Sequence, residues 1–172
     1  MSRTHPLLFV CATWIAVLLS SAAPGLARAP LSFKLDDQFE RTHTAMSLFK
    51  SGRPIIFLGG DQRESRAAIT RWLAPLRKTF GVRVHVMGYL DLQEVPFFVP
   101  KSLVRRGLKK NLSRLPVLCD FKGLLAHKLG FLPKTLIQVQ IFDGSGRTLG
   151  GVRGAYSASR LAQVRHVLHG RR

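Results

Sequence analysis

The sequence predicts an α/β sandwich with a mixed central sheet. Segments with the apolar patterns of strands alternate with segments whose apolar residues recur at helical spacing, in the order strand, helix, strand, helix, strand, hairpin and helix. Helical connections make successive strands parallel, whereas a tight turn makes two strands antiparallel. We therefore expect parallel early strands and an antiparallel final pair.

The first elements of the chain are short. We expect an extended segment at 31–35, a polar turn at 36–39 and a short helix at 44–50. The uninterrupted apolar run at 55–58 has the composition of a buried strand. This strand is expected to break at Gly59-Gly60, where the chain turns polar.

A helix is expected to begin at Asp61. Asp61 and Glu64 resemble a capping box, in which two side chains satisfy free N–H groups at the start of a helix. Pro75 is expected to kink or end this helix. Its apolar residues share one buried face: Ala68, Ile69, Trp72, Leu73 and Leu76.

The C-terminal half continues the alternation. Three valines at positions 82, 84 and 86 alternate with Arg83, His85 and Met87, which predicts a strand at 82–88. The remaining elements are a helix at 99–112, a strand at 116–119, a short helix at 124–129, hairpin strands at 136–142 and 148–152 around the turn 143–146, and a last helix capped by Ser157.

Residues 1–29 have the pattern of a secretory signal peptide. Basic residues precede an uncharged apolar run at 7–19, small residues follow, and Ala27-Arg28-Ala29 is an A-x-A cleavage pattern. The run is shorter than the roughly 20 residues that a membrane span needs. We therefore expect cleavage after Ala29, one domain at 30–172 without a transmembrane segment, and a location in the periplasm or outside the cell.

The mature chain would be strongly basic and would hold one cysteine. Loss of Arg3 and Arg28 leaves 25 lysines and arginines against 9 acids, a formal charge of +16. This charge indicates an anionic partner, which for an exported protein is an envelope component or an acidic protein surface. Cys119 has no second cysteine with which to form an internal disulfide.

Three segments resemble the thioredoxin-like superfamily, in its redoxin branch. FKLDDQF at 33–39 resembles the F-x-L-x-D start of redoxin domains, and FDGSGR at 142–147 resembles their closing hairpin. VLCDFKG at 117–123 is similar to the segment just before that hairpin. From Phe97 onward the chain is also similar to the YtfJ family of small periplasmic thioredoxin-fold proteins. The resemblance implies a three-layer sandwich over the whole mature chain.

The chain departs from this superfamily at its redox site. Thioredoxin-like oxidoreductases carry a C-x-x-C motif, or one reactive cysteine, where a helix N-terminus stabilises a thiolate. The matching residues here are Gln62, Arg63, Glu64 and Ser65. The superfamily's cis-proline also lacks a clear counterpart, because Pro133 precedes the usual position and Ile137 occupies it. The sequence therefore predicts the loss of the usual redox chemistry.

Cys119 carries the alternative function. A thiol oxidoreductase or peroxidase would use it as a lone reactive cysteine that pairs with another chain. Its place in an apolar strand, after Val117 and Leu118, indicates instead an inert buried side chain. No cofactor is implied, and no metal site is expected because His166 and His169 have no third ligand nearby in the sequence. His43 is expected to pair with Asp36 or Asp37.

Two binding sites are predicted. The first is the loop from Asp61 to Ser65, where backbone amides, reinforced by Arg63 and Arg66, could hold an anion, or where Asp61 or Ser65 simply caps the helix. The second is a basic surface on the 99–112 helix and just beyond it. Its residues are Lys101, Arg105, Arg106, Lys109, Lys110 and Arg114.

The basic surface has two interpretations. With Val104, Leu108 and Leu112 on the inner face of the helix, the charges would face an anionic surface or merely solvent. Phe97 and Phe98, just before this helix, are expected to be core anchors. Nucleic acid is not the expected partner, because no RNA-binding aromatic motif occurs and only the charge supports it. The predicted function is that of a binding or accessory module.

Overall fold

The computed structural model describes residues 31–60, 65–132 and 137–170. Five strands within these residues form one sheet: β3 (Ile55–Gly60), β4 (His85–Asp91), β5 (Val117–Asp120), β6 (Gln138–Phe142) and β7 (Thr148–Arg153). Their order across the sheet is β5-β4-β3-β6-β7. Strands β3, β4 and β5 are parallel, whereas β6 is antiparallel to both β3 and β7. The predicted mixed sheet is confirmed.

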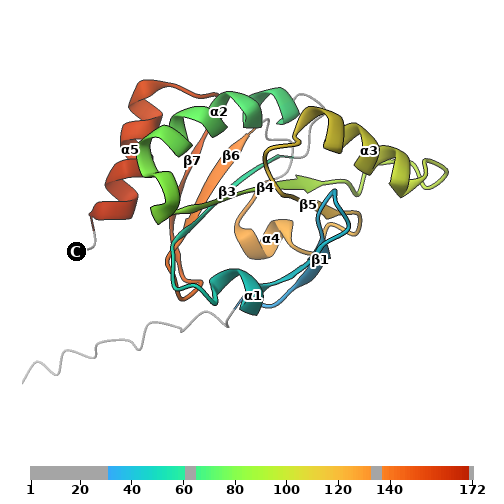
Figure 1. The fold of residues 1–172 in the computed structure, drawn as a ribbon, viewed down its shortest axis with the longest axis horizontal. Coiled ribbons are helices and arrows are strands. Elements are labelled where there is room, and N and C mark those ends of the chain that lie inside the picture. Colours follow the sequence, from blue (N-terminus) through green and yellow to red (C-terminus); the bar gives the residue numbers. More distant parts are fainter. Residues whose placement is uncertain (1–30, 61–64, 133–136, 171–172) are drawn as a thin grey trace, which may run out of the picture.

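Helices cover both faces of this sheet (Figure 1). One face carries α2 (Ser65–Phe80), α3 (Lys101–Asn111) and α5 (Ala158–His169). The other face carries α1 (Ala45–Phe49), α4 (Ala126–Leu129) and a small hairpin of β1 (Lys34–Asp36) and β2 (Thr42–Thr44). Each face of the sheet has its own apolar core, so the three-layer sandwich is also confirmed.

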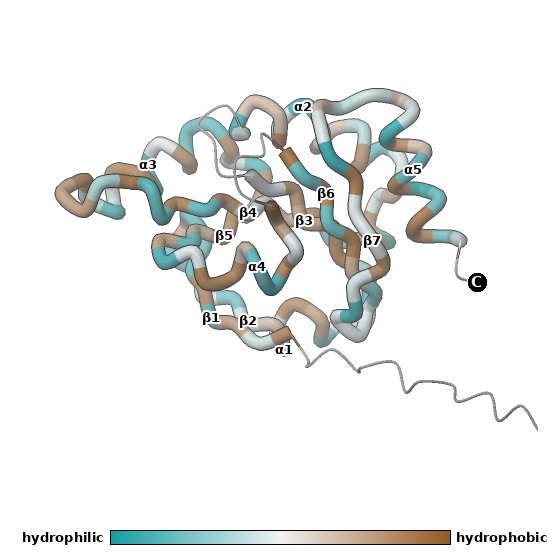
Figure 2. Tube along the Cα trace, turned by 180° about the vertical axis from the view of Figure 1, so that it is seen from behind, coloured by the Kyte–Doolittle hydropathy of each residue, from teal (hydrophilic) through white to brown (hydrophobic). Residues whose placement is uncertain are grey.

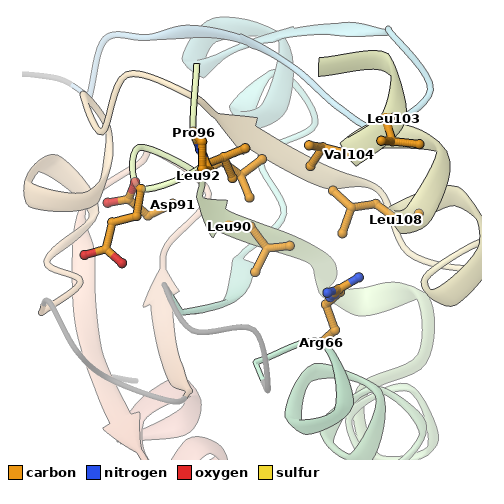
Figure 3. Close-up of a pocket in the computed structure, with 11 residues that line it drawn as sticks. Arg66, Leu90, Asp91, Leu92, Pro96, Leu103, Val104 and Leu108 are labelled. Carbon is orange, nitrogen blue, oxygen red and sulfur yellow. The ribbon is translucent and has the colours of Figure 1, made fainter. Parts of the chain in front are cut away.

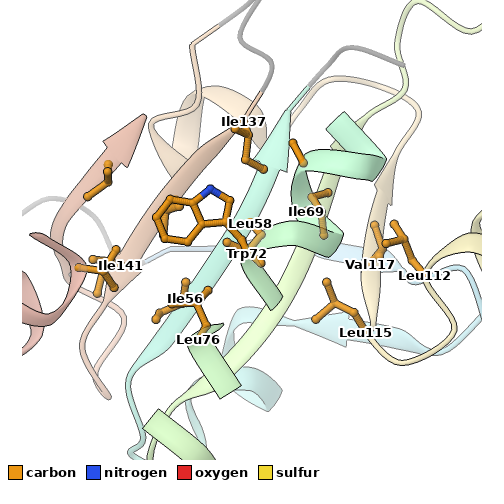
Figure 4. Close-up of a cluster of buried hydrophobic side chains, with 14 of the residues drawn as sticks. Ile56, Leu58, Ile69, Trp72, Leu76, Leu112, Leu115, Val117, Ile137 and Ile141 are labelled. Atoms are coloured by element: carbon orange, nitrogen blue, oxygen red, sulfur yellow. The ribbon is translucent and has the colours of Figure 1, made fainter. Parts of the chain in front are cut away.

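Trp72 lies at the centre of the larger core (Figure 4). The predicted inner face of α2 packs on β3 and β6, where Trp72 contacts a cluster that includes Leu58 and Ile137. Trp72, Ile69 and Leu76 are all fully buried. The indole N–H of Trp72 donates a hydrogen bond to the carbonyl of Gly154, at 3.1 Å. The one polar atom of this side chain is therefore satisfied inside the core.

The predicted break of strand β3 at its two glycines is wrong. The strand continues through Gly59 and Gly60, both of them buried. A Cβ atom at Gly59 would lie 2.7 Å from the ring of Phe131 and 2.9 Å from the carbonyl oxygen of Tyr89. Glycine is needed here because neighbouring groups approach the strand closely, and not because the chain turns.

Two other boundaries also differ from the sequence prediction. The predicted strand at 82–88 begins later, at His85, because Gly81–Arg83 forms a single 3₁₀ turn that leaves Val82 exposed. Of the two effects predicted for Pro75, a kink or an end of the helix, the second is wrong, because α2 continues to Phe80. The residues after Pro75 include Leu76 and Phe80, and the burial of these two side chains stabilises the last turns. The predicted capping box at Asp61 and Glu64 lies outside the described residues.

The N-terminal segment forms the β1–β2 hairpin, which the sequence did not predict. Gln38 in its turn is fully buried, and it hydrogen-bonds to the connection between α3 and β5. The Gln38 amide nitrogen donates to the carbonyls of Leu112 and Leu115, at 3.1 and 2.8 Å. The Gln38 amide oxygen accepts from the Val117 N–H, at 2.7 Å. This one side chain therefore holds the hairpin against the edge strand of the main sheet.

His43 pairs with Asp37, as one of the two predicted alternatives states. The His43 Nε2 lies 3.0 Å from a carboxylate oxygen of Asp37. The other carboxylate oxygen of Asp37 accepts the N–H groups of Phe39 and Arg41. These contacts close the turn between β1 and β2, so His43 has a structural role.

In the described part of the chain, no helix is both long and apolar enough to cross a membrane.

Candidate functional site

The parallel strands end at one edge of the sheet. Gly60, Asp91 and Asp120 are the last residues of β3, β4 and β5, and Asp91 lies beside Asp120 in the register of these strands. Open α/β sheets bind their ligands at this edge. The predicted anion loop joins β3 to α2 here, but Asp61, Gln62, Arg63 and Glu64 lie outside the described residues. Ser65, at the described start of α2, is fully buried.

Cys119 lies on β5 among the residues of the larger core. It is a free cysteine with only 3% of its surface exposed. Burial raises the pKa of the Cys119 thiol to about 12, although the neighbouring Arg105 partly opposes this rise. The sulfur contacts the carbonyl of Val117, at 3.5 Å. Such a thiol is protonated and shielded from partner disulfides at neutral pH, whereas a reactive cysteine needs an accessible thiolate.

Asp120 and Tyr89 form a buried polar pair at the edge of the sheet where the parallel strands end. The Tyr89 hydroxyl donates to a carboxylate oxygen of Asp120, at 3.1 Å, and the Leu125 N–H donates to the same oxygen, at 2.7 Å. The Lys122 N–H donates to the other oxygen. Burial, and then the charge of Asp120, raises the pKa of Tyr89. These groups hold the loop between β5 and α4.

Helix α3 carries most of the predicted basic surface, and most of it is exposed. The exposed residues are Lys101, Arg106, Lys109, Lys110 and, just beyond the helix, Arg114. The ammonium of Lys101 lies 5.3 Å from the ring centre of Phe121, which is the range of a cation–π contact. The inner side of the helix is apolar as predicted, with Leu108 buried.

Arg105 does not belong to this exposed surface. Its guanidinium pairs with the carboxylate of Asp36 on β1, at 3.3 Å, and only 19% of its side chain is exposed. It also lies over the ring of Phe121, 5.8 Å from the ring centre. Arg105 therefore holds α3 to the N-terminal hairpin. The prediction that placed it on the outer side was wrong because β1 covers that flank of the helix.

An apolar pocket of about 530 Å³ lies between α2, α3 and the loop that follows β4 (Figure 3). Its walls are mainly aliphatic, and Arg66 of α2 and Asp91 of β4 are charged groups at its sides. The apolar residues of the wall include Leu90, Leu92, Val95, Leu103, Val104 and Leu108. Three separate segments build this pocket, and the sequence showed only the helical face of α3. Pockets of this size and lining are typical ligand sites.

Phe97 and Phe98 lie beside this pocket, and their predicted burial is wrong. Phe97 is 99% exposed and Phe98 is 72% exposed. The two rings pack edge to face, with centres 5.8 Å apart and planes at 80°. Their loop closes short turns on itself, from Val95 to Leu92 and from Val99 to Pro96, and so stands away from the core. Figure 2 shows this apolar loop projecting beyond α3.

Solved structures share this arrangement of strands and helices. The chain is similar to the pneumococcal exposed lipoprotein thioredoxin of Streptococcus pneumoniae, with a TM-score of 0.60 and 17% identity over 78% of this chain and 97% of that one. It is similar to a thiol-disulfide oxidoreductase from Bacteroides fragilis, with a TM-score of 0.56 and 17% identity over 81% of this chain and 98% of that one. It is also similar to peroxidoxin BcpB from Mycobacterium tuberculosis, with a TM-score of 0.55 and 18% identity over 83% of this chain and 95% of that one.

These similarities show that the protein has a thioredoxin-like fold, as its sequence predicts. It shares this fold with thiol-disulfide oxidoreductases and a peroxidoxin. No protein-family model and no curated protein matches the sequence. Sequence identities below 20% establish a shared fold but not a shared function. The function therefore has to be argued from the residues of this chain.

Proposed function

We propose that this protein is an exported thioredoxin-fold module that binds an anionic partner through α3. The observation that carries the proposal is the exposed basic side of this helix, where Arg106, Lys109 and Lys110 lie together beyond its buried face. No acidic residue occurs between Val95 and Cys119. The partner is an envelope component or an acidic protein surface, because a concentrated positive charge selects anionic surfaces.

Export and the narrower relationship are parts of the same proposal. Residues 1–29 serve as a signal peptide that is cleaved after Ala29, and residues 30–172 form the mature domain. The similarity of the chain from Phe97 onward to the YtfJ family agrees with a periplasmic location. The measurement is the N-terminal residue of the protein isolated from the cell envelope. A protein that begins at Pro30 would support this part of the proposal, and a protein that retains residues 1–29 would contradict it.

The proposal includes the absence of thiol catalysis. Gln62 and Ser65 stand where redox enzymes of this fold carry cysteines, and neither side chain exchanges disulfides. The remaining thiol, Cys119, is buried at the edge of the sheet and has a pKa raised to about 12. An enzyme acting through Cys119 is the alternative, and thiol reactivity separates the two functions.

We expect the Cys119 thiol of the folded protein to react with an aromatic disulfide reagent at least about 100-fold more slowly at pH 8 than in denaturant. A pKa of about 12 leaves only a trace of thiolate at pH 8, whereas the unfolded thiol, with a pKa near 9, is partly ionised. The rate for the folded protein should rise with pH until about pH 12, provided that the fold persists. The measurement is the release of the coloured thiol from the reagent.

Insulin-disulfide reduction with dithiothreitol tests catalysis itself. The chain that begins at Pro30 should be no faster than dithiothreitol alone, and the Cys119→Ser variant should give the same rate. Turnover that disappears in Cys119→Ser would refute the binding proposal in favour of a thiol enzyme. Rapid labelling of Cys119 in the folded protein at pH 7 would point in the same direction.

Removal of two charges from α3 tests the binding surface. We expect Lys109→Gln with Lys110→Gln to weaken binding to an anionic probe by about 30-fold at low salt, since each charge contributes about 1 kcal/mol near an anionic surface. Both side chains are exposed, so the fold should remain intact. The probes are heparin and vesicles that contain phosphatidylglycerol, measured by co-sedimentation or titration.

A matched variant controls for net charge. Lys78→Gln on α2 with Arg165→Gln on α5 removes the same charge from exposed positions outside α3. We expect this pair to weaken binding by less than about threefold. If both double variants lose the same affinity, the protein responds to net charge alone and α3 is not a binding surface.

A further inference from the structure

We infer that the anionic partner is the surface of a phospholipid bilayer, into which the loop before α3 inserts Phe97 and Phe98. This inference rests on the proposed function, because it names the partner that α3 would bind. The loop follows β4 and ends at Pro100, directly before α3. The inference comes from the exposure of the two rings and from the position of the charges behind them.

The exposed rings form a convex apolar tip. Phe97 and Phe98 are 99% and 72% exposed, and Leu103 on the first turn of α3 is 55% exposed. Phenylalanine is usually buried, so two adjacent exposed phenylalanines in one projecting loop indicate a surface that is covered when the protein acts, and Leu103, which also lines the apolar pocket, lies behind them. Figure 2 shows the hydrophobic colour of this projecting loop.

The charges are placed behind the tip, along the same helix. Arg106 follows Leu103 by one helical turn and Lys110 follows it by two, which at about 1.5 Å per residue places them about 5 to 10 Å further along the axis. Amphipathic segments at a membrane surface insert their apolar side chains to about this depth, while basic side chains stay at the phosphates. The acids that precede the tip in the sequence are Asp91, at the end of β4, and the exposed Glu94, three residues before Phe97.

The shape of the tip favours a bilayer over a protein partner. A protein would need a concave, complementary pocket to receive two adjacent rings on a convex loop. A bilayer has no such requirement, because lipid chains adapt to whatever inserts. The neighbouring exposed charges of Arg106, Lys109 and Lys110 have long side chains that can reach phosphates spread over a surface.

The first experiment is vesicle binding by the chain that begins at Pro30. Both apolar cores and all described strands and helices lie beyond this residue, so the domain keeps its fold, and the apolar run at 7–19 cannot contribute. We expect binding to vesicles of phosphatidylglycerol and phosphatidylcholine but not to phosphatidylcholine alone. Phe97→Ser with Phe98→Ser should weaken this binding by at least about tenfold without a change in melting temperature.

Met46→Ser is the matched control. Met46 is 84% exposed on α1, on the opposite side of the sheet from α3, so its loss should leave vesicle binding unchanged. A Phe97→Trp variant then reports insertion directly. Its fluorescence should shift to shorter wavelength on vesicles and be quenched by lipids with brominated acyl chains. Trp72, the other tryptophan after residue 30, is fully buried and provides the unquenched background.

The outcomes separate this inference from the proposed function. Salt-sensitive vesicle binding that survives loss of both phenylalanines, with no quenching at position 97, would overturn insertion and leave an electrostatic partner. Binding to heparin but not to anionic vesicles, through Lys109 and Lys110, would overturn the bilayer while the proposed function stands. If neither probe binds and the charge variants change nothing, both conclusions fail.

Discussion

Trp72→Ala should lower the free energy of unfolding by about 3 to 5 kcal/mol, because it removes the largest side chain from the larger core. Trp72 is fully buried between α2 and the sheet. Alanine would leave a cavity among Leu58, Ile69 and Ile137 that this tightly packed core cannot close. It would also leave the carbonyl of Gly154 without its indole donor. Urea denaturation followed by circular dichroism measures the loss.

A second variant at this position separates packing from the hydrogen bond. Trp72→Phe keeps most of the ring and its edge contact with Tyr156, whose ring centre lies 5.4 Å away, but removes the N–H donor. We expect about half of the loss seen for alanine. Arg71→Ala, at the exposed neighbouring position on α2, should change stability by less than about 0.5 kcal/mol. A Trp72→Ala loss below about 1 kcal/mol would contradict this account of the core.

Gln38→Leu should lower the free energy of unfolding by about 2 to 5 kcal/mol, although leucine is similar in volume and more apolar. The substitution leaves the Val117 N–H and the Leu115 carbonyl without the partners that Gln38 supplies. Each buried polar group that loses its partner costs about 1 to 3 kcal/mol. The connection between α3 and β5 should also exchange its amide hydrogens faster than in the wild type, which mass spectrometry can measure.

The control for Gln38 is Gln163→Leu on α5. Gln163 is exposed, so its replacement should alter stability by less than about 0.5 kcal/mol. Gln38→Glu provides a further comparison, because it keeps an acceptor for Val117 but loses the donor and buries a charge. A Gln38→Leu protein as stable as the wild type would show that water replaces the lost partners and that the hairpin does not depend on this side chain.

The contrast between Trp72 and Gln38 shows how far the sequence alone reaches. Trp72 could be predicted as a core residue because it recurs with Ile69 and Leu76 at helical spacing, a local pattern that burial of one face requires. Gln38 could not, because its partners lie 74 to 79 residues away in the chain. A glutamine in a polar turn has no local feature that distinguishes a buried position from a solvated one.

The candidate site shows the same division. The exposed lysines of α3 were predictable from charge and helical spacing, but the inward position of Arg105 depends on Asp36 of β1, which is far away in sequence. The pocket between α2, β4 and α3 exists only where three segments meet. Phe97 and Phe98 were misassigned because phenylalanine is usually buried, whereas the local turns of their loop hold them away from both cores.

By itself, the sequence determined the fold class, the order of the elements that follow the N-terminal hairpin, the direction of the strands in the main sheet and the buried face of α2. These features follow from local periodicity and from turns, which act over a few residues at a time. Only the tertiary structure decided which polar and aromatic side chains are buried, that β3 continues through Gly59, and that a pocket and an apolar tip lie beside the basic helix. Burial depends on the neighbours that other segments supply, and no local pattern contains them.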